Sequence, residues 1–182
     1  MKLVILDRDG VINEDSDDYI KSPEEWIPID GSINAICELG RHDFIVVVAT
    51  NQSGIGRGLF DEYDLARIHQ KMCSAIEDAG GFIHGIFFCP HAPHENCNCR
   101  KPKTGLLSAI ASEFNLSLEG IPFIGDSLKD IEAARSSHCD PILVKTGNGE
   151  KTLAAISGKD LKGITIATDL RHAVPNIIDR YS

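Results

Sequence analysis

The chain has 182 residues, enough for one α/β domain and too few for a second full one, so residues 1–182 are expected to form a single domain. Its composition is 42% hydrophobic and 25% charged, which excludes a disordered or fibrous protein. With 27 acidic and 18 basic residues the formal net charge is -9, which argues against nucleic acid or an anionic membrane as a partner.

Short apolar runs bounded by turn residues predict β-strands. The runs are continuous rather than alternating, which is typical of strands buried on both faces of a parallel sheet. Each is far shorter than the ~20 residues of a membrane helix, and the first follows the N-terminus directly, so we expect neither a membrane segment nor a signal peptide. In chain order the runs are 3–6, 44–49, 83–88, 121–124, 142–144 and 164–167.

Helix-like segments lie between these runs, at 32–41, 61–79, 104–115, 127–136, 150–156 and 170–180. The clearest of them has Asp61 as a plausible N-cap, apolar residues at helical spacing, and Gly80 and Gly81 as its end. Strands that alternate with helices predict right-handed crossovers. We therefore expect a doubly wound, mostly parallel α/β sheet with helices on both faces.

Two long segments interrupt this alternation. Residues 13–29 are acidic and irregular, and residues 89–103 are rich in Cys, His, Pro and basic residues. Long loops inside compact domains are usually functional or disordered. We therefore expect these two segments to carry functional residues.

Carboxylates gather at the predicted strand ends. Asp7 and Asp9 follow the first strand, and Asp126 and Asp130 follow the fourth. In open α/β sheets ligands bind beyond the carboxyl ends of the strands, so these groups are expected to meet. Such a negative cluster favours a hard cation such as Mg²⁺, beside which a carboxylate can attack phosphorus. For the first pair alone, a turn or a helix cap is an equally good explanation.

The motifs at these strand ends resemble those of the haloacid dehalogenase superfamily of aspartyl phosphotransferases. Residues 6–11, Leu-Asp-Arg-Asp-Gly-Val, are similar to its first motif, and residues 125–130, Gly-Asp-Ser-Leu-Lys-Asp, to its acidic metal-binding motif. Between them, Thr50 stands where the superfamily has a Ser or Thr that bonds the transferring phosphoryl group, and Lys101 stands at the motif lysine. The resemblance implies a HAD-like fold and phosphoryl transfer.

The same resemblance implies a role for each acidic residue. Asp7 would be the nucleophile, and Asp9 the general acid and then the general base. Mg²⁺ would be bound by Asp7, by Asp126 and by the backbone carbonyl of Asp9, with Asp130 in a supporting position. A nucleophile that is first phosphorylated and then hydrolysed divides one difficult step into two easier ones.

Four soft or borderline ligands in the second long loop predict a zinc site. Cys89, His91, Cys97 and Cys99 suit tetrahedral Zn²⁺, and four protein ligands leave no open position for water, so the site is expected to be structural. His94 could replace His91, and chance thiols in a reduced loop are the alternative. Six scattered and clustered cysteines do not resemble a secreted disulfide scaffold, so we expect a reducing, cytoplasmic compartment.

The joint pattern narrows the resemblance. DRDGVIN at 7–13, TNQSGIGRG at 50–58 and the zinc loop that ends in CRKP at 99–102 are similar to the D-glycero-D-manno-heptose-1,7-bisphosphate 7-phosphatases, over essentially the whole chain. This resemblance favours His91 in the zinc site. It implies Mg²⁺-dependent removal of the 7-phosphate through a phosphoaspartate, on the route to ADP-heptose and lipopolysaccharide. It also implies the absence of a large cap domain and a phosphorylated sugar as the ligand. We expect the protein to be a monomer.

The resemblance also implies which residues contact the substrate. Arg100 would recognise the sugar or its second phosphate, a task that suits a planar cation with several donors. The implied contacts are Asp15, Tyr19, Thr50, Asn51, Gln52, Ser53, Arg100, Lys101 and Ser127.

Alternatives remain at this stage. The five-residue gap between His91 and Cys97, together with Thr104, is similar to histidinol-phosphate phosphatases, whereas Ser53 and Ser127 fit the heptose enzymes better. The sequence does not separate the α from the β anomer of the heptose. From other classes, a receiver-like signalling domain or a zinc-stabilised binding module without catalysis is possible.

Overall fold

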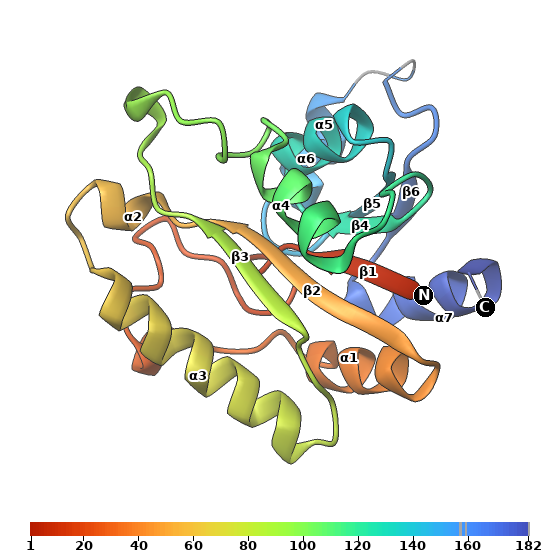
Figure 1. The fold of residues 1–182 in the computed structure, drawn as a ribbon, viewed down its shortest axis with the longest axis horizontal. Helices are drawn as coiled ribbons and strands as arrows, with labels where there is room; N and C mark the ends of the chain where they lie inside the picture. The colour runs from red at the N-terminus through yellow and green to blue at the C-terminus, as the bar shows by residue number, and fades with distance from the viewer. Residues whose placement is uncertain (157, 159, 182) are drawn as a thin grey trace.

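A parallel β-sheet forms the centre of the protein. The computed structural model describes residues 1–156, 158 and 160–181. In this part of the chain the strands follow the order β3-β2-β1-β4-β5-β6, and each neighbouring pair is parallel (Figure 1). Every predicted strand is confirmed, with bounds β1 (Lys2–Leu6), β2 (Phe44–Asn51), β3 (Gly85–Cys89), β4 (Pro122–Gly125), β5 (Asp140–Val144) and β6 (Thr165–Ala167).

The helices that join these strands also match the prediction within a residue or two. They are α1 (Ser32–Arg41), α3 (Glu62–Asp78), α4 (Gly105–Phe114), α5 (Leu128–Ser136), α6 (Gly149–Ala155) and α7 (Leu170–Tyr181). One helical turn was not expected, namely α2 (Ser53–Gly56). The 3-10 turns η1 (Pro23–Glu25) and η2 (Pro93–Glu95), one in each long loop, were not expected either. Such short elements are too brief to show a helical period.

The predicted cap of α3 is confirmed. The Asp61 carboxylate accepts a hydrogen bond from the backbone N–H of Asp64 at 2.8 Å, and the Asp64 carboxylate accepts one from the backbone N–H of Asp61 at 3.2 Å. These bonds satisfy N–H groups that have no partner inside the helix, and such a cap contributes about 1 kcal/mol.

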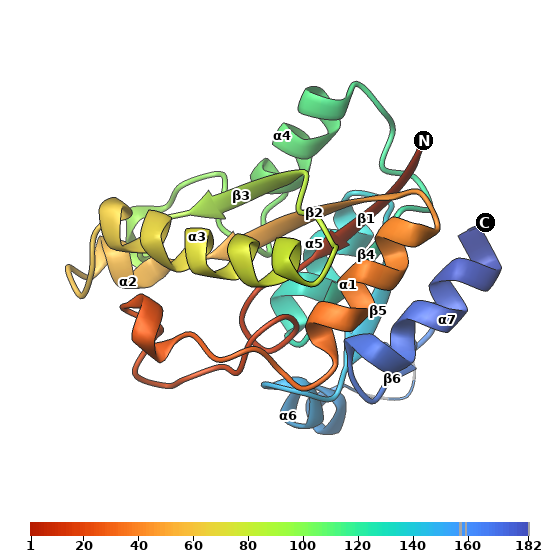
Figure 2. The ribbon, with the colours of Figure 1, turned by 90° about the horizontal axis from the view of Figure 1, so that it is seen from below.

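Helices cover both faces of the sheet, as expected. Val4 and Leu6 of β1 pack with α1, α3 and α7, which lie side by side in Figure 2. Leu3 and Ile5 point to the other face and pack with α4 and α5. Successive side chains of a strand alternate between faces, so an unbroken apolar run is needed when both faces are covered.

The strand order changes direction between β1 and β4. The chain places β2 and β3 on one side of β1, then crosses back and places β4, β5 and β6 on the other side. A crevice forms at such a point, outside the carboxyl ends of the strands. Asp7 follows β1 and Asp126 follows β4, and the backbone N–H of Asp7 donates to Ile124 O at 2.8 Å. The topology therefore brings two distant motifs together.

The acidic loop at residues 13–29 folds back over the end of β1. Asn13 forms isolated bridges with Asp9 and Pro28, and its side chain is buried. The loop therefore lies next to the crevice. None of the helices in residues 1–156, 158 and 160–181 has the length and hydrophobicity of a membrane-spanning segment.

Candidate active site and metal-binding cluster

A pocket of about 410 Å³ opens beyond the carboxyl ends of the strands. It is lined by residues that follow β1, β2, β4 and β5 and by the end of the loop after β3. Most of the predicted site residues line it, namely Asp7, Asp9, Asp15, Asn51, Ser53, Arg100, Lys101, Asp126, Ser127 and Asp130.

Lys101 joins two of the carboxylates. Its Nζ lies 3.0 Å from Asp7 Oδ1 and 2.6 Å from Asp130 Oδ1, and it donates to Ala49 O at 2.7 Å. The residue is 1% exposed. Burial alone lowers the pKa of Lys101, but the charges of Asp130 and Asp7 outweigh it and raise this pKa above its usual value. Lys101 is therefore a permanent cation inside the protein.

Asp7, Asp126 and Asp130 form a group that could hold a metal ion. One carboxylate oxygen from each lies within 4.8 Å of the others, and all three residues are buried. Burial, followed by the charge of Asp130, raises the pKa of Asp126 to about 7 and that of Asp7 well above its usual range. A divalent cation would remove this repulsion, and carboxylate oxygens are the ligands that Mg²⁺ prefers.

Two glycines leave room for the Asp126 carboxylate. Gly10 and Gly147 both have positive φ, 81° and 57°, and a Cβ atom on either one would collide with Asp126 Oδ2. The backbone N–H of Asn148 donates to the same oxygen at 2.7 Å. The carboxylate is therefore held in a cradle made largely of backbone, a tight fit that suits a metal ligand.

Asp130 is engaged within the protein. Its Oδ2 accepts hydrogen bonds from the Ser127 hydroxyl at 2.7 Å and the Ser127 N–H at 3.0 Å, while Oδ1 faces Lys101. Ser127 and Asp130 also form the capping box of α5. This pairing is consistent with a supporting position for Asp130 rather than a direct one.

Asp9 is surrounded by donors. Its Oδ1 accepts from Arg8 Nε at 3.0 Å, Arg8 Nη2 at 2.7 Å and Asn13 Nδ2 at 2.9 Å, and its Oδ2 accepts from Gln52 Nε2 at 2.9 Å. Burial raises the pKa of Asp9, but the Arg8 charge and these hydrogen bonds outweigh it, so the pKa is lowered overall. Asp9 is therefore a carboxylate in the free protein.

The sequence motifs did not identify the partners of Arg8. Arg8 is 0% exposed, and its Nη1 lies 3.2 Å from His69 Nε2. His69 is buried on α3, where burial and then the Arg8 charge lower its pKa to about 3. The position of Arg8 between Asp7 and Asp9 was the available signal. Side chains alternate in direction at a strand end, so Arg8 points inward, where its buried charge needs hydrogen-bond partners.

Four of the predicted substrate residues have polar contacts or surroundings of their own. Thr50 and Gln52 are buried, and Gln52 Nε2 donates to Thr50 Oγ1 at 2.9 Å. Tyr19 lines a different hollow, formed by the acidic loop. Asn51 lines the pocket, but its Oδ1 and Nδ2 bond the backbone N–H and C=O of Lys101, each at 3.0 Å. Asn51 is thus placed to position Lys101.

Asn148 is a pocket residue that sequence motifs did not single out as a ligand. Its Nδ2 donates to Asp15 Oδ2 at 2.7 Å, in addition to the backbone bond to Asp126. It therefore connects the acidic loop to the candidate metal ligands. Its place directly beyond β5 was the only signal, since strand ends are where ligands bind.

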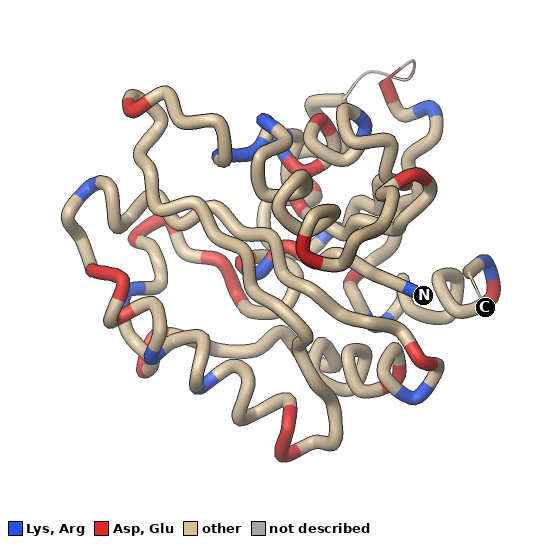
Figure 3. Tube along the Cα trace, in the orientation of Figure 1, with Lys and Arg blue, Asp and Glu red and all other residues tan. Residues whose placement is uncertain are grey.

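Positive charge lines one edge of the pocket. Arg100 and Lys129 line both the pocket and an adjoining hollow of about 300 Å³. Within the described chain, Arg100 Nη1 is buried without a hydrogen-bond partner. Burial, followed by the nearby Arg100, lowers the pKa of Lys129. In Figure 3, basic and acidic stretches meet where the loop before α4 passes the start of α5. This edge can attract an anion beside the acidic cluster.

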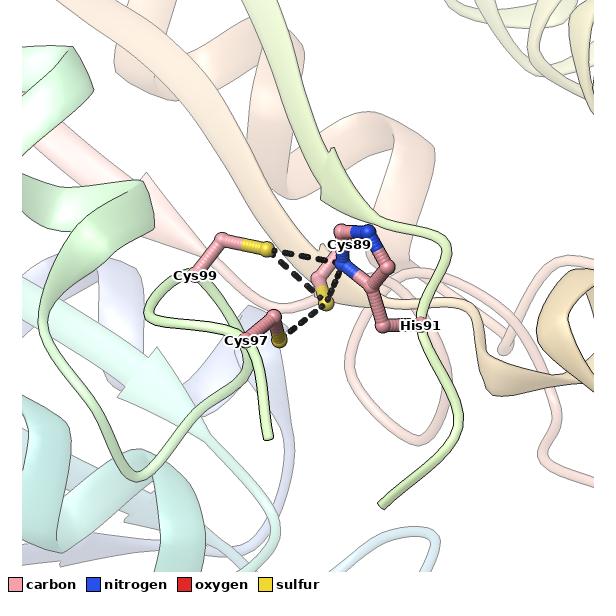
Figure 4. A group of neighbouring side chains, drawn as sticks. All are labelled: Cys89, His91, Cys97 and Cys99. Atoms are coloured by element: carbon pink, nitrogen blue, oxygen red, sulfur yellow. Dashed lines mark hydrogen bonds between the residues drawn. The ribbon is translucent and has the colours of Figure 1, made fainter. Parts of the chain in front are cut away.

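The four predicted zinc ligands meet in one cluster (Figure 4). The Cys89 sulfur lies 3.6 Å from that of Cys97, 3.1 Å from that of Cys99 and 3.5 Å from His91 Nδ1, and His91 Nδ1 lies 3.2 Å from Cys99 Sγ. Ligands around a tetrahedral Zn²⁺ lie roughly 3.5 to 3.8 Å apart. The donor set suits zinc, and Cys99, which lies closer than this to Cys89 and His91, would move outward around the ion. His91 belongs to the cluster, whereas His94 is exposed on η2.

One family model and several relatives match this chain. Residues 98–173 match the HAD-hydrolase-like family. The chain is 51% identical to the D-glycero-beta-D-manno-heptose-1,7-bisphosphate 7-phosphatase of Bordetella bronchiseptica, over 93% of this chain and 94% of that protein. It is 53% identical to the protein of the same name from Pseudomonas putida, over 84% of this chain and 87% of that one.

Solved structures agree with these matches. The crystal structure of D,D-heptose 1,7-bisphosphate phosphatase from B. bronchiseptica, complexed with magnesium and phosphate, superposes with a TM-score of 0.94 at 48% identity and covers 98% of this chain and 99% of that one. The Burkholderia thailandensis enzyme superposes with a TM-score of 0.78 at 40% identity, over 99% and 100% of the two chains. The chain therefore belongs to the D-glycero-beta-D-manno-heptose-1,7-bisphosphate 7-phosphatase family, within the HAD-like hydrolases.

Proposed function

We propose that this protein is a Mg²⁺-dependent phosphatase that removes the 7-phosphate of D-glycero-beta-D-manno-heptose 1,7-bisphosphate. The observation that carries the proposal is the pairing of two features in one pocket. The first is an acidic cluster with Asp7 beside a buried lysine, and the second is an edge with the cations Arg100 and Lys129, which form no ion pair among the residues that the structure describes. A bisphosphate can place one phosphate at the acidic cluster and the other at the cationic edge. The β anomer follows the names of the relatives.

In the first half of the reaction Asp7 is the nucleophile. Its carboxylate oxygen forms a bond to phosphorus while the bond from phosphorus to the sugar oxygen breaks, and Asp9 gives its proton to that oxygen. Lys101 keeps Asp7 oriented and offsets its charge. Magnesium held by Asp7, Asp126 and the backbone carbonyl of Asp9 would offset the repulsion between the carboxylate and the phosphate.

In the second half Asp9 acts as the base. A water molecule attacks the phosphorus of the phosphorylated Asp7, and Asp9 takes a proton from that water. The lowered pKa keeps Asp9 deprotonated in the free protein, which is the form that can accept a proton. A substrate phosphate beside Asp9 adds negative charge, which raises the pKa again and favours the protonated form needed in the first half.

We assign the Cys89, His91, Cys97 and Cys99 cluster to a structural Zn²⁺. The loop at 89–103 contains few apolar residues, so a metal ion supplies the order that a hydrophobic core cannot. The backbone N–H of Arg100 lies 3.4 Å from Cys97 Sγ, which connects the cluster to the pocket. Zinc is then what holds the loop against the substrate site.

Removal of zinc is expected to lower both thermal stability and activity. Purified protein should contain stoichiometric zinc, and Cys99→Ser should lose it, because three ligands bind the ion more weakly than four. Metal analysis, thermal unfolding and phosphate release measure the three effects. Cys73→Ser, a cysteine of α3 outside the cluster, is the matched control and should keep the zinc. Fully active protein without zinc would contradict the assignment.

Loss of the cationic edge is expected to weaken recognition of the second phosphate. In Arg100→Ala and Lys129→Ala, KM for the 1,7-bisphosphate should rise about 10-fold or more, since each removes a charge-assisted contact. KM for a heptose 7-monophosphate should change little. Lys151→Ala on α6, exposed, is the control. An equal rise for both substrates would show that these cations do not read the second phosphate.

The substrate assignment is tested by phosphate release from three compounds. The α and β anomers of heptose 1,7-bisphosphate are compared with histidinol phosphate, because the five-residue gap in the zinc loop is the one feature that favours the histidinol enzymes. We expect the highest kcat/KM for the β anomer, and none without Mg²⁺. Preference for histidinol phosphate would overturn the substrate.

This activity places the protein in the supply of nucleotide-activated heptose for lipopolysaccharide, in the cytoplasm. The single sheet supports one catalytic domain across the chain. All proposed ligands come from one chain, so a monomer suffices for the reaction. Gel filtration under assay conditions tests this last point.

A further inference from the structure

The protein has a buried polar connection between α3 and the pocket that the proposed reaction has not used. It runs from His69 through Arg8 to Asp9. His69 Nε2 lies 3.2 Å from Arg8 Nη1, and Arg8 Nη2 lies 2.7 Å from Asp9 Oδ1. Arg8 and His69 are both buried, whereas Asp9 lines the pocket.

We propose that His69 is a positioning residue for the phosphatase reaction, which acts through Arg8 to orient the carboxylate of Asp9. The inference rests on the proposed function, since it assumes that Asp9 transfers the proton. His69 touches neither the pocket nor the reacting atoms.

The donors of Arg8 explain why His69 is needed. A guanidinium only donates, so His69 Nε2 must accept from Nη1, which requires the neutral ring with its proton on Nδ1. Arg8 Nε and Nη2 point to Asp9 Oδ1. Without His69, Nη1 would be a buried donor with no partner, and the guanidinium could rotate to find one. That rotation would release Asp9.

The His69 ring is itself held in place. It packs edge-on against Phe88 of β3, with ring centroids 6.3 Å apart and an interplanar angle of 62°. The acceptor for Arg8 is therefore fixed by α3 and by a strand of the sheet. The direction of the guanidinium is thus set by the core rather than by the loop that carries it.

The two oxygens of Asp9 then have different roles. Oδ1 accepts from two Arg8 nitrogens and from Asn13, which leaves it no free lone pair. Among the contacts that the structure describes, Oδ2 accepts from Gln52 alone. Oδ2 is therefore the oxygen that carries the proton to the leaving oxygen and later takes one from water. Proton transfer requires that it keep this direction.

The test compares two phosphate esters. A sugar phosphate needs a proton on its leaving oxygen, whereas p-nitrophenyl phosphate releases a stable anion. In His69→Leu we expect the single-turnover rate with the heptose bisphosphate to fall about 100-fold with little change in KM, and the nitrophenolate burst of the first turnover, which precedes hydrolysis of the phosphorylated Asp7, to slow by less than about 3-fold. In His69→Gln, whose Oε1 can accept from Arg8, the sugar rate should return to within about 3-fold of the wild type.

Controls separate this role from a loss of fold. His172→Leu changes an exposed histidine on α7 and should leave both rates unchanged. Should His69→Leu not fold by circular dichroism, Arg8→Lys gives the same test, because an ammonium cannot contact Asp9 and His69 as the fork does. Equal loss with both esters, or no recovery in His69→Gln, overturns the proposal. Wild-type protein that hydrolyses neither ester contradicts the proposed function itself.

Discussion

Asp7→Asn is expected to reduce phosphatase activity by about 10⁴-fold or more, because an amide cannot replace the carboxylate that attacks phosphorus. No phosphorylated protein should be trapped by acid quench and mass spectrometry, whereas the wild type should carry a phosphate on Asp7. Burial and the charge of Asp130 raise the pKa of Asp7, so its charge is unfavourable without metal. The variant should therefore unfold at the same or a higher temperature than the wild type in the absence of Mg²⁺.

The control for this experiment is Asp18→Asn, which changes an exposed carboxylate in the acidic loop and should keep full activity. Full activity in Asp7→Asn would refute the mechanism. A receiver-like domain or a zinc-stabilised binding module would show no turnover even in the wild type. The pair of variants thus separates the enzyme from both alternatives.

Lys101→Met is expected to lower the free energy of unfolding by about 3 to 5 kcal/mol at neutral pH, because it leaves buried carboxylates without their cation. Lys101 is almost fully buried and contacts both Asp7 and Asp130. Lys101 lowers the pKa of Asp7, so removal of the lysine raises that pKa further in the folded state. The contribution of Asp7 to stability is fully present below its unfolded pKa and is lost as pH rises through its raised folded pKa, so the destabilisation should shrink in acid.

Urea unfolding at several pH values measures this effect, and phosphate release from a stable fraction measures the catalytic loss. Lys151→Met, which removes an exposed positive charge on α6, should change stability by less than about 0.5 kcal/mol. A Lys101→Met protein with wild-type stability at pH 7 would show that the two carboxylates are not charged in the fold. Magnesium should partly restore the variant, since it offsets the same repulsion.

Much of the fold follows from local pattern. The β-strands are continuous apolar runs because both faces of the sheet are covered, as Leu3 and Val4 on opposite faces show. The helix after Asp61 begins where its cap predicts. A single helical turn, such as α2 at 53–56, is too short to show a repeat of apolar residues, so it was not predicted.

Much of the candidate site follows from position as well. Asp7, Asp126 and Lys101 meet because each lies at or beyond a strand end, or in a loop that leads from one. The cluster of Cys89, His91, Cys97 and Cys99 forms within eleven residues, so its short spacing predicts a metal site, while the choice of His91 over His94 depends on the fold. Tyr19 was assigned to the substrate by resemblance, and in the structure it lines a hollow of the acidic loop that shares Asp15 with the pocket. Loops lack the regular repeat of helices and strands, so the sequence of a loop does not predict where its side chains point.

The sequence by itself determined the doubly wound sheet, the acidic cluster and the cluster of cysteines and histidine, because strand burial, strand ends and short spacing are all local properties. Only the tertiary structure decided which side chains hold these groups in place. His69 meets Arg8 across 61 residues, and Asn148 meets Asp126 across 22. Such contacts depend on how α3 and the loop after β5 pack on the sheet, and no local spacing encodes that packing.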